Sequence, residues 1–236
     1  MPAAPAAKIV IAEARLDLAA NVQLDDLLAT LGYTNVIFRL GALTLSDVAD
    51  ADVVCGDEFV WAIAKTALFR SCYDAGMKVF TTGNDTTNAH PAVTNWTSKD
   101  GSTLTMSPVT PAVHKASSGW VAEAQDTDTG QMPIALRAGA LPIARASWAS
   151  GAQTGIAAFA EVNPNGSKGR WAHVQQATGN RIFAGYRTMV GSIFDWLLEP
   201  PTGTPGASLS ARGFQGGMTL KGSPDGSARI RTFEGG

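Results

Sequence analysis

Charged residues are scarce in this chain. Only 16% of its 236 residues are charged, against roughly 25% in typical soluble domains. The 18 basic and 20 acidic residues are well mixed and give a formal charge of −2. Because no basic stripe is present, nucleic acid is not expected as a partner. A surface this poor in charge, in a chain with six tryptophans, favours partial coverage by other proteins.

Cysteine and long apolar runs are scarce as well. Cys55 and Cys72 show no CxxC spacing, so neither a disulfide framework nor a zinc site is expected, and a reducing cytoplasm fits this composition. No run approaches the ~20 apolar residues of a membrane span, and no membrane association is expected. The apolar stretch 9–12 is shorter than the core of a signal peptide and Glu13 follows it at once, so we expect no leader there.

The first ninety residues alternate between apolar strands and helices. Continuous apolar runs predict buried strands at 8–12, 35–40, 52–56 and 78–82. Helical spacing over 21–33 and 59–75 predicts helices that end at Gly32 and Gly76. Strands that alternate with helices imply a parallel sheet with right-handed crossovers.

The second half of the chain is less regular. The segment 91–130 is polar, has no sustained period and is predicted to be irregular. Strand-like runs then follow at 134–136, 141–147, 154–162 and 170–175. Met189, Ile193, Trp196 and Leu197 share one face of a final amphipathic helix, which Pro200 and Pro201 end. The expected fold class is therefore α/β: a doubly wound, mostly parallel, flavodoxin-like sheet with extra late mixed strands.

The last 36 residues differ in composition from the rest. They are rich in glycine and have too few large apolar side chains to build a core. We therefore expect two parts, an α/β domain over 1–200 and an extended Gly-rich C-terminal arm over 201–236. Strand-like pieces around GSPDG suggest that this arm binds neighbouring subunits by strand addition. The apolar residues expected to make these contacts are Phe214, Met218, Leu220, Ile230 and Phe233.

The main candidate site follows the fourth predicted strand, in the polar stretch TTGNDTTNAH. In an open α/β sheet, ligands bind at the carboxyl ends of strands. There His90 could act as a base with Asp85 orienting it, or these residues could cap turns and a helix start. Asp57 and Glu58, after the third predicted strand, could bind a metal or serve as acid and base, or could cap the next helix.

The order of elements, the strand–turn TTGND and the final helix ending in FDWLL resemble the class I glutamine amidotransferase-like superfamily, with the ThuA-like branch nearest. The resemblance covers roughly residues 8–199. It implies a cysteine nucleophile in a Gly-x-Cys-x-Gly elbow after a strand, and a His–Glu pair near the last strands. The matching strand end, 82–85, has no cysteine. Cys55 lies one strand earlier without the first glycine of the elbow, and a buried strand cysteine is usually inert.

The histidines do not complete this machinery either. His173 lies near where the family's histidine falls, but Gln175 and Gln176 stand in place of a glutamate, so a structural role is favoured. His114 is expected in a surface loop. The three histidines, at 90, 114 and 173, show no metal-binding spacing. Dinucleotide, P-loop and hydrolase-elbow motifs are missing, so neither a cofactor nor a metal is expected.

These observations favour a non-catalytic structural or interaction protein on an amidotransferase-like scaffold. We expect a component of a large assembly such as a phage virion, in a tail, baseplate or capsid accessory part. Its partners would be other protein subunits, bound through the C-terminal arm. Its location would be the virion on this interpretation and the cytoplasm otherwise. The alternative is a ThuA-like hydrolase or carbohydrate-binding domain that uses Asp57, Glu58, Asp85 and His90.

Overall fold

The computed structural model describes residues 4–13, 19–56, 63–83, 90–98, 103–125, 131–151, 154–175 and 181–200. All but Pro200 belong to one compact unit, Met1–Glu199. The segment 201–236 lies outside the described residues, as do Asp57, Glu58 and Asp85. The division into a domain over 1–200 and an arm over 201–236, and the arm's five apolar contact residues, therefore stay predictions.

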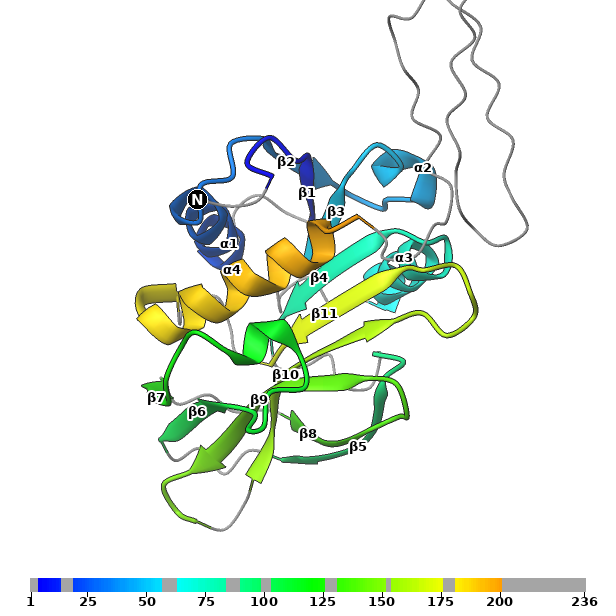
Figure 1. The fold of residues 1–236 in the computed structure, drawn as a ribbon. Helices are drawn as coiled ribbons and strands as arrows, with labels where there is room; N and C mark the ends of the chain where they lie inside the picture. Colours follow the sequence, from blue (N-terminus) through cyan, green and yellow to red (C-terminus); the bar gives the residue numbers. More distant parts are fainter. Residues whose placement is uncertain are drawn as a thin grey trace, which may run out of the picture. The chain divides into compact units, whose positions relative to one another are not determined.

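A nine-stranded sheet forms the centre of this unit (Figure 1). Its strands, in their order across the sheet, are β2 (Val36–Leu40), β1 (Ile9–Glu13), β3 (Val53–Gly56), β4 (Lys78–Thr82), β11 (Arg170–Val174), β10 (Thr154–Val162), β9 (Leu141–Trp148), β6 (Leu104–Pro108) and β7 (Glu123–Gln125). The first five run parallel, and the last four continue the sheet with antiparallel pairing. A separate sheet pairs β5 (Val93–Ser98) with β8 (Gln131–Leu136).

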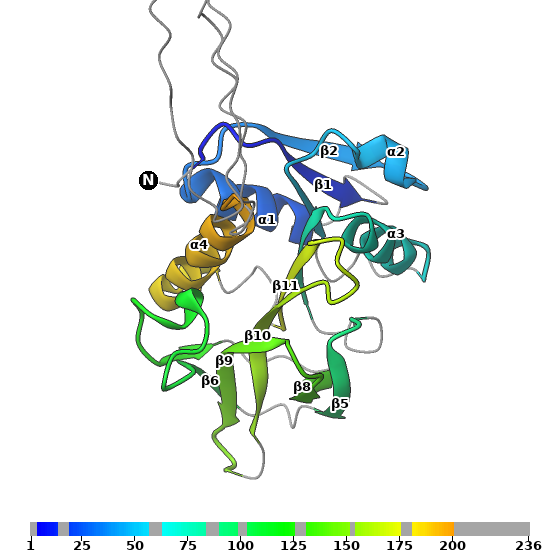
Figure 2. The ribbon, with the colours of Figure 1, turned by 45° about the vertical axis from the view of Figure 1, so that its right-hand side comes forward.

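Helices cover both faces of the parallel strands, as Figures 1 and 2 show. They are α1 (Ala19–Thr30), α2 (Leu45–Val48), α3 (Ile63–Asp74) and α4 (Ala184–Leu198). Ile9 and Ile11 of β1 pack in one core cluster with α1 and α4, whereas Val10 packs in another with α2 and α3. Since successive strand side chains point to opposite faces, this division explains the continuous apolar run of β1. The predicted doubly wound α/β fold is confirmed.

The predicted glycine ends of the first and third helices are also confirmed. Gly32 follows α1 with φ +91°, a conformation that favours glycine. Its N–H donates to the carbonyl of Ala29, and the Tyr33 N–H donates to the carbonyl of Leu28. This is the hydrogen-bond pattern of a Schellman motif, and Gly76 ends α3 in the same way with φ +89°. At each helix end this motif turns the chain sharply toward the next strand.

The prediction of an irregular segment over 91–130 is wrong. This region holds β5, β6, β7 and a short 3₁₀ helix, η2 (Lys115–Ser117). Its strands are paired mainly by residues later in the chain, β5 by β8 and β6 by β9. Within β6 only Leu104 and Met106 are buried, a pattern too short to stand out locally. No helix among the described residues has the length and apolar character needed to cross a membrane.

Candidate functional site

The candidate site lies where β4 and β11 run side by side toward their carboxyl ends. The parallel register places Thr81 opposite His173, and both side chains are almost completely buried. Thr81 Oγ1 is 2.9 Å from His173 Nδ1, and His173 Nε2 is 2.9 Å from Gln175 Oε1. Both nitrogens of this imidazole are therefore engaged by neighbouring side chains.

These contacts belong to a longer series, which we call the His173 chain: Trp171, Thr81, His173, Gln175 and the backbone carbonyl of Gln131. The Gln131 carbonyl can only accept, and Gln175 donates its amide N–H to it. The Gln175 Oε1 then accepts from His173, which places a proton on Nε2. In the neutral ring Nδ1 accepts from the Thr81 hydroxyl, whose oxygen accepts from Trp171 Nε1–H at 2.9 Å. Each donor in the series thus has one acceptor.

The order hydroxyl, imidazole, amide has the outline of a nucleophile, a base and an orienting group, but it lacks their chemistry. Thr81 lies within β4 with no exposed surface, so no substrate carbon can approach its hydroxyl. Gln175 stands two residues after His173, where the amidotransferase resemblance implies a glutamate. A neutral amide orients an imidazole but does not stabilise the imidazolium that forms during acyl transfer. The His173 chain therefore joins β4, β11 and β8 and offers no base to solvent.

His90, the base of the alternative interpretation, lies in the interior. Its ring centroid is 4.3 Å from that of Trp171 and 4.6 Å from that of Phe159, and its Nδ1 accepts the Ala92 N–H. Burial holds the pKa of His90 well below its usual value, and the neighbouring groups His173 and Arg137 lower that pKa further. The ring is therefore neutral at pH 7 and packs against aromatic side chains. Its predicted partner Asp85, and the pair Asp57 and Glu58, lie outside the described residues, so their roles stay predictions.

Both cysteines are buried and free, as expected from the sequence. Burial raises the pKa of Cys72 to about 11 and raises that of Cys55 well above its usual value. Because the thiolate is the nucleophile, neither thiol is activated at neutral pH. Within the ranges that the structure describes, no three His, Cys, Asp or Glu side chains converge as a metal site.

The prediction that His114 lies in a surface loop is wrong. The side chain is buried, and its ring centroid is 5.0 Å from that of Trp196 in α4. Nδ1 accepts the Ala116 N–H and so caps η2. The local sequence around His114 shows no sustained helical or strand period, and the tryptophan that covers it comes from a distant part of the chain, so sequence neighbours gave no signal.

Comparisons with known proteins show the fold. No protein-family model matches the chain, and no curated protein does. A solved structure of the mmIFT52 N-terminal domain matches with a TM-score of 0.54 and 8% identity, over 84% of this chain and all of that one. A putative GMP synthase component from Thermoplasma acidophilum matches with a TM-score of 0.51 and 11% identity, over 80% of this chain and 96% of that one.

The chain shares its overall fold with both solved structures. The likeness to the GMP synthase component confirms the fold-level resemblance stated from the sequence. The narrower assignment to the ThuA-like branch stays a prediction. At 8% and 11% identity the likeness extends to architecture, and one architecture hosts many unrelated functions. What the chain does has to be argued from its own residues.

Proposed function

We propose that the chain is a non-catalytic interaction subunit of a protein assembly, built on an amidotransferase-like scaffold. The observation that carries this proposal is that, in the His173 chain of hydrogen bonds, both imidazole nitrogens of His173 are engaged by other side chains. The histidine nearest the family's catalytic position is buried, donates to the amide of Gln175 and accepts from Thr81. A histidine whose two ring nitrogens are both hydrogen-bonded inside the protein stabilises the sheet and performs no acid–base chemistry on a ligand.

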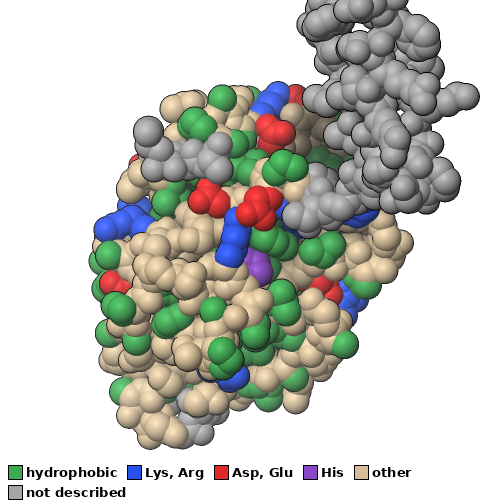
Figure 3. Space-filling model, in the orientation of Figure 1, with side chains coloured by type: hydrophobic (Ala, Val, Ile, Leu, Met, Phe, Trp, Pro, Cys, Tyr) green, Lys and Arg blue, Asp and Glu red, His purple; other side chains and the backbone are tan. Residues whose placement is uncertain are grey.

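The surface supports a role in protein contacts. Figure 3 shows the face of the molecule that is turned to the viewer in Figure 1. Its charged side chains are few, and apolar and uncharged polar groups lie between them. Val121 and Ile182 are 77% and 64% exposed. The backbone carbonyl of Val121 lies close to Gly185, and Ile182 lies two residues before the start of α4, so both are at the N-terminal end of that helix. Exposed apolar groups of this size are typical of contact surfaces when they gather at one place.

The edge strand β2 offers a second kind of contact. It pairs with β1 on one side, and no described strand pairs with its outer side. Most of its residues are half-buried, and Arg39 is its only charged side chain. Open edges of this kind accept an added strand. We propose that this edge receives the strand-like pieces of segment 201–236 from a neighbouring copy, with Ile230 and Phe233 among their contacts. The phage-virion setting is the narrower form of this proposal.

The test compares the full chain with residues 1–200 by light scattering. We expect the full chain to form an oligomer, with a mass that is a multiple of 24.5 kDa, and the truncated chain to be a monomer with the same melting temperature. Ile230→Asp together with Phe233→Asp should weaken assembly, whereas Ser227→Asp, in the same segment, should not. A full chain that stays monomeric at all concentrations would contradict the assembly role.

Glutamine hydrolysis by the full chain provides the second measurement. We expect no glutamate release above the rate in buffer. Release that is abolished by His173→Ala in a variant that remains folded would overturn the non-catalytic assignment. The two measurements are independent, so a failure of the assembly role and a failure of the non-catalytic role can be told apart.

A further inference from the structure

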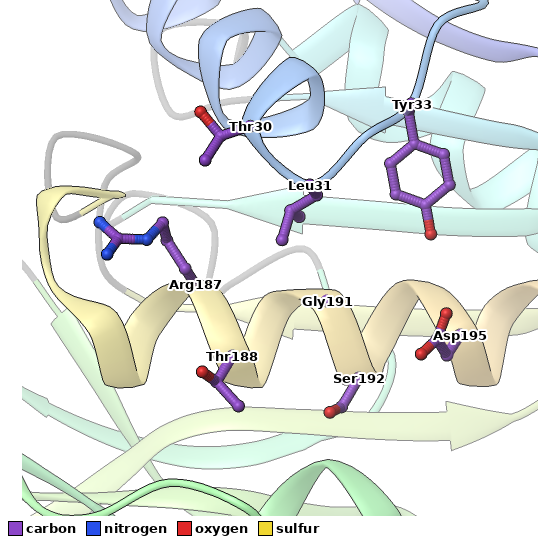
Figure 4. Close-up of a pocket in the computed structure, with 8 residues that line it drawn as sticks. All are labelled: Thr30, Leu31, Tyr33, Arg187, Thr188, Gly191, Ser192 and Asp195. Atoms are coloured by element: carbon purple, nitrogen blue, oxygen red, sulfur yellow. The ribbon is translucent and has the colours of Figure 1, made fainter. Parts of the chain in front are cut away.

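A pocket of about 300 Å³ lies between the end of α1 and the middle of α4 (Figure 4). The Leu31 side chain packs against Gly191 and divides this space. The Arg187 guanidinium turns to the carbonyls of Arg181 and Ile182. The polar groups of this pocket therefore do not converge on one ligand, whereas those of the turn between β10 and β11 converge on one reaction.

The turn between β10 and β11 spans residues 163–169 and contains the only Asn–Gly step in the sequence, Asn165–Gly166. Both residues are exposed. The turn requires the glycine, because Gly166 has φ +87°, a conformation that strains other residues. Beyond its chain neighbours, no atom lies within 4 Å of the place where a Cβ would stand at this position, so water reaches the Gly166 backbone.

The Asn165 side chain folds back over the backbone of its own turn. Its Oδ1 accepts the Ser167 N–H at 2.9 Å, and this hydrogen bond closes a ring that contains both the Asn165 Cγ and the Gly166 nitrogen. Among the described residues, no acceptor engages the Gly166 N–H and no partner engages Asn165 Nδ2. The nitrogen that could attack Cγ and the nitrogen that could leave it are thus both unengaged.

The Ser167 N–H also favours attack on this carboxamide. A nucleophile that adds to Cγ places negative charge on Oδ1, and a backbone N–H already directed at that oxygen stabilises the charge. The attacking nitrogen belongs to the same hydrogen-bonded ring, so little conformational freedom remains to be lost. Because Gly166 has no side chain, nothing on that residue hinders the approach.

Asn163, two residues earlier, differs in each respect. Pro164 follows it, and proline has no N–H to lose. The Asn163 side chain is buried, and its Nδ2 donates to the Tyr73 carbonyl and to Asp74 Oδ1 at 3.2 and 3.0 Å. The same turn therefore holds one accessible and one protected asparagine.

We propose that Asn165 deamidates through a cyclic imide with Gly166, and that the isoaspartate produced loosens this turn from the end of α3. The Gly166 nitrogen loses its proton to hydroxide and bonds to the Asn165 Cγ. The Cγ–Nδ2 bond breaks, and Nδ2 takes a proton from water and leaves as ammonia. Water then opens the imide at either carbonyl, which gives aspartate or isoaspartate. This modification is independent of the role proposed in assembly.

Isoaspartate alters the structure because the turn fits closely against the end of α3 (Figure 1). The Ser167 hydroxyl donates to the Tyr73 carbonyl at 3.3 Å, and a Cβ at position 76 would stand 2.6 Å from the Ser167 carbonyl oxygen. Isoaspartate routes the main chain through its own side-chain methylene and so adds one backbone atom before Gly166. The lengthened turn cannot keep Ser167 in both contacts.

The test is peptide mass spectrometry of the full chain during storage at neutral and at mildly alkaline pH. We expect the peptide that contains Asn165 to convert with first-order kinetics to a product in which a carboxyl group replaces the carboxamide. The rate should rise in proportion to the hydroxide concentration, and Asn163, in the same peptide, should remain intact. An Asn165 that stays intact would overturn the proposal.

The same measurement in guanidinium chloride separates the contribution of the fold from that of the local sequence. We expect the folded chain to convert at least as fast as the unfolded one, because the turn holds the reacting atoms in one ring and supplies the Ser167 N–H. A folded chain that converts many-fold more slowly would show that the turn protects Asn165, and would refute the assignment.

Isoaspartate is measured by methyl transfer from S-adenosylmethionine with an isoaspartyl methyltransferase. We expect the stored chain to accept methyl groups and Asn165→Gln to lose most of this signal, because glutamine would have to form a larger ring. Asn95→Gln, the same substitution at another exposed asparagine, is the matched control and should keep the signal. Equal signals from the two variants would place the isoaspartate elsewhere and contradict the proposal.

Asn165→Asp tests the structural consequence, because it introduces the charge without lengthening the backbone. We expect its melting temperature to equal that of the freshly prepared chain, and the isoaspartate-containing chain to melt at a lower temperature. Equal melting temperatures for all three would show that the turn stays on α3 and would overturn this half of the proposal.

Discussion

At the scale of single residues, Thr81 holds the His173 chain together, because its hydroxyl both donates and accepts. Thr81→Val keeps the shape of the side chain and removes both functions, leaving Trp171 Nε1–H and His173 Nδ1 without their partner. Each unpaired buried group costs about 1–3 kcal/mol, so we expect a loss of about 2–4 kcal/mol in the free energy of unfolding, measured in urea. Thr34→Val, at an exposed position, is the matched control and should change stability by less than about 0.5 kcal/mol. An equally small effect at Thr81 would show that the series is not a stabilising unit.

A second single residue, His114, should make the free energy of unfolding depend on pH. Burial, and then the charge of Lys115, lower the pKa of His114 to about 4. The unfolded chain therefore binds this proton at a higher pH than the folded chain does, so stability is full above about pH 6.5 and falls as the pH drops toward 4. At pH 5 the loss from this group is about 2 kcal/mol relative to pH 7.

His114→Asn tests this expectation, because asparagine can still accept the Ala116 N–H but does not titrate. Urea unfolding at pH 7 and pH 5 should show a smaller loss in the variant than in the unaltered chain, by about 2 kcal/mol. An unchanged difference between the two pH values would assign the acid sensitivity to other groups, of which buried His90 is the first candidate, since its pKa is lowered in the same direction.

At the scale of elements, the N-terminus of helix α4 is capped by a side chain from strand β7. Its N-cap residue, Phe183, makes no side-chain cap, and instead Oε2 of Glu123 in β7 accepts the N–H groups of Gly185 and Tyr186 at 2.9 and 3.4 Å. A side chain at position 185 would block this approach, because its Cβ would stand 2.7 Å from Oε2. The carboxylate also meets the positive end of the helix dipole.

We expect Glu123→Ala to lower the free energy of unfolding by about 1–2 kcal/mol and Glu123→Gln, which keeps an acceptor without the charge, by about half as much. The control is Glu199→Gln, at the opposite end of α4, whose ion pair with Lys115 is largely exposed and should contribute less than about 1 kcal/mol. Equal effects of the alanine and glutamine substitutions would indicate that packing, rather than the cap, carries the contribution of Glu123.

The elements also show where sequence reasoning works and where it ends. Strands β1, β3 and β4 are buried on both faces, so each appears as a local apolar run, and Gly32 marks a helix end by its own chemistry. Strands β5, β6 and β7 have no such signal, because pairing with β8 and β9, rather than local composition, defines most of them. The candidate site behaves likewise: His173 could be singled out from its position, but its partner Thr81, far away in the sequence, could not.

At the scale of the whole molecule, one ion pair joins the helical layer to the antiparallel extension. Glu161 of β10 is almost fully buried and accepts from the Tyr73 hydroxyl of α3 at 2.8 Å. Arg137, which follows β8, contacts both oxygens of this carboxylate. The pair is asymmetric, because the Arg137 side chain is 30% exposed and that of Glu161 only 1%. Removing one partner should therefore not cost the same as removing the other.

Among the described residues, Arg137→Met leaves the buried Glu161 carboxylate with Tyr73 as its remaining side-chain partner, and we expect it to cost about 3–5 kcal/mol. Glu161→Gln keeps an acceptor for Tyr73 and leaves a cation that can turn toward water, so its cost should be about 1–2 kcal/mol. The double variant Arg137→Met, Glu161→Leu removes both charges and should be more stable than Arg137→Met alone. Unfolding in urea, followed by tryptophan fluorescence and by far-UV circular dichroism, gives all three values. Equal costs for the two single variants would mean that Glu161 reaches solvent, and that the link between the layers is carried by packing of Trp171 and Tyr73 instead.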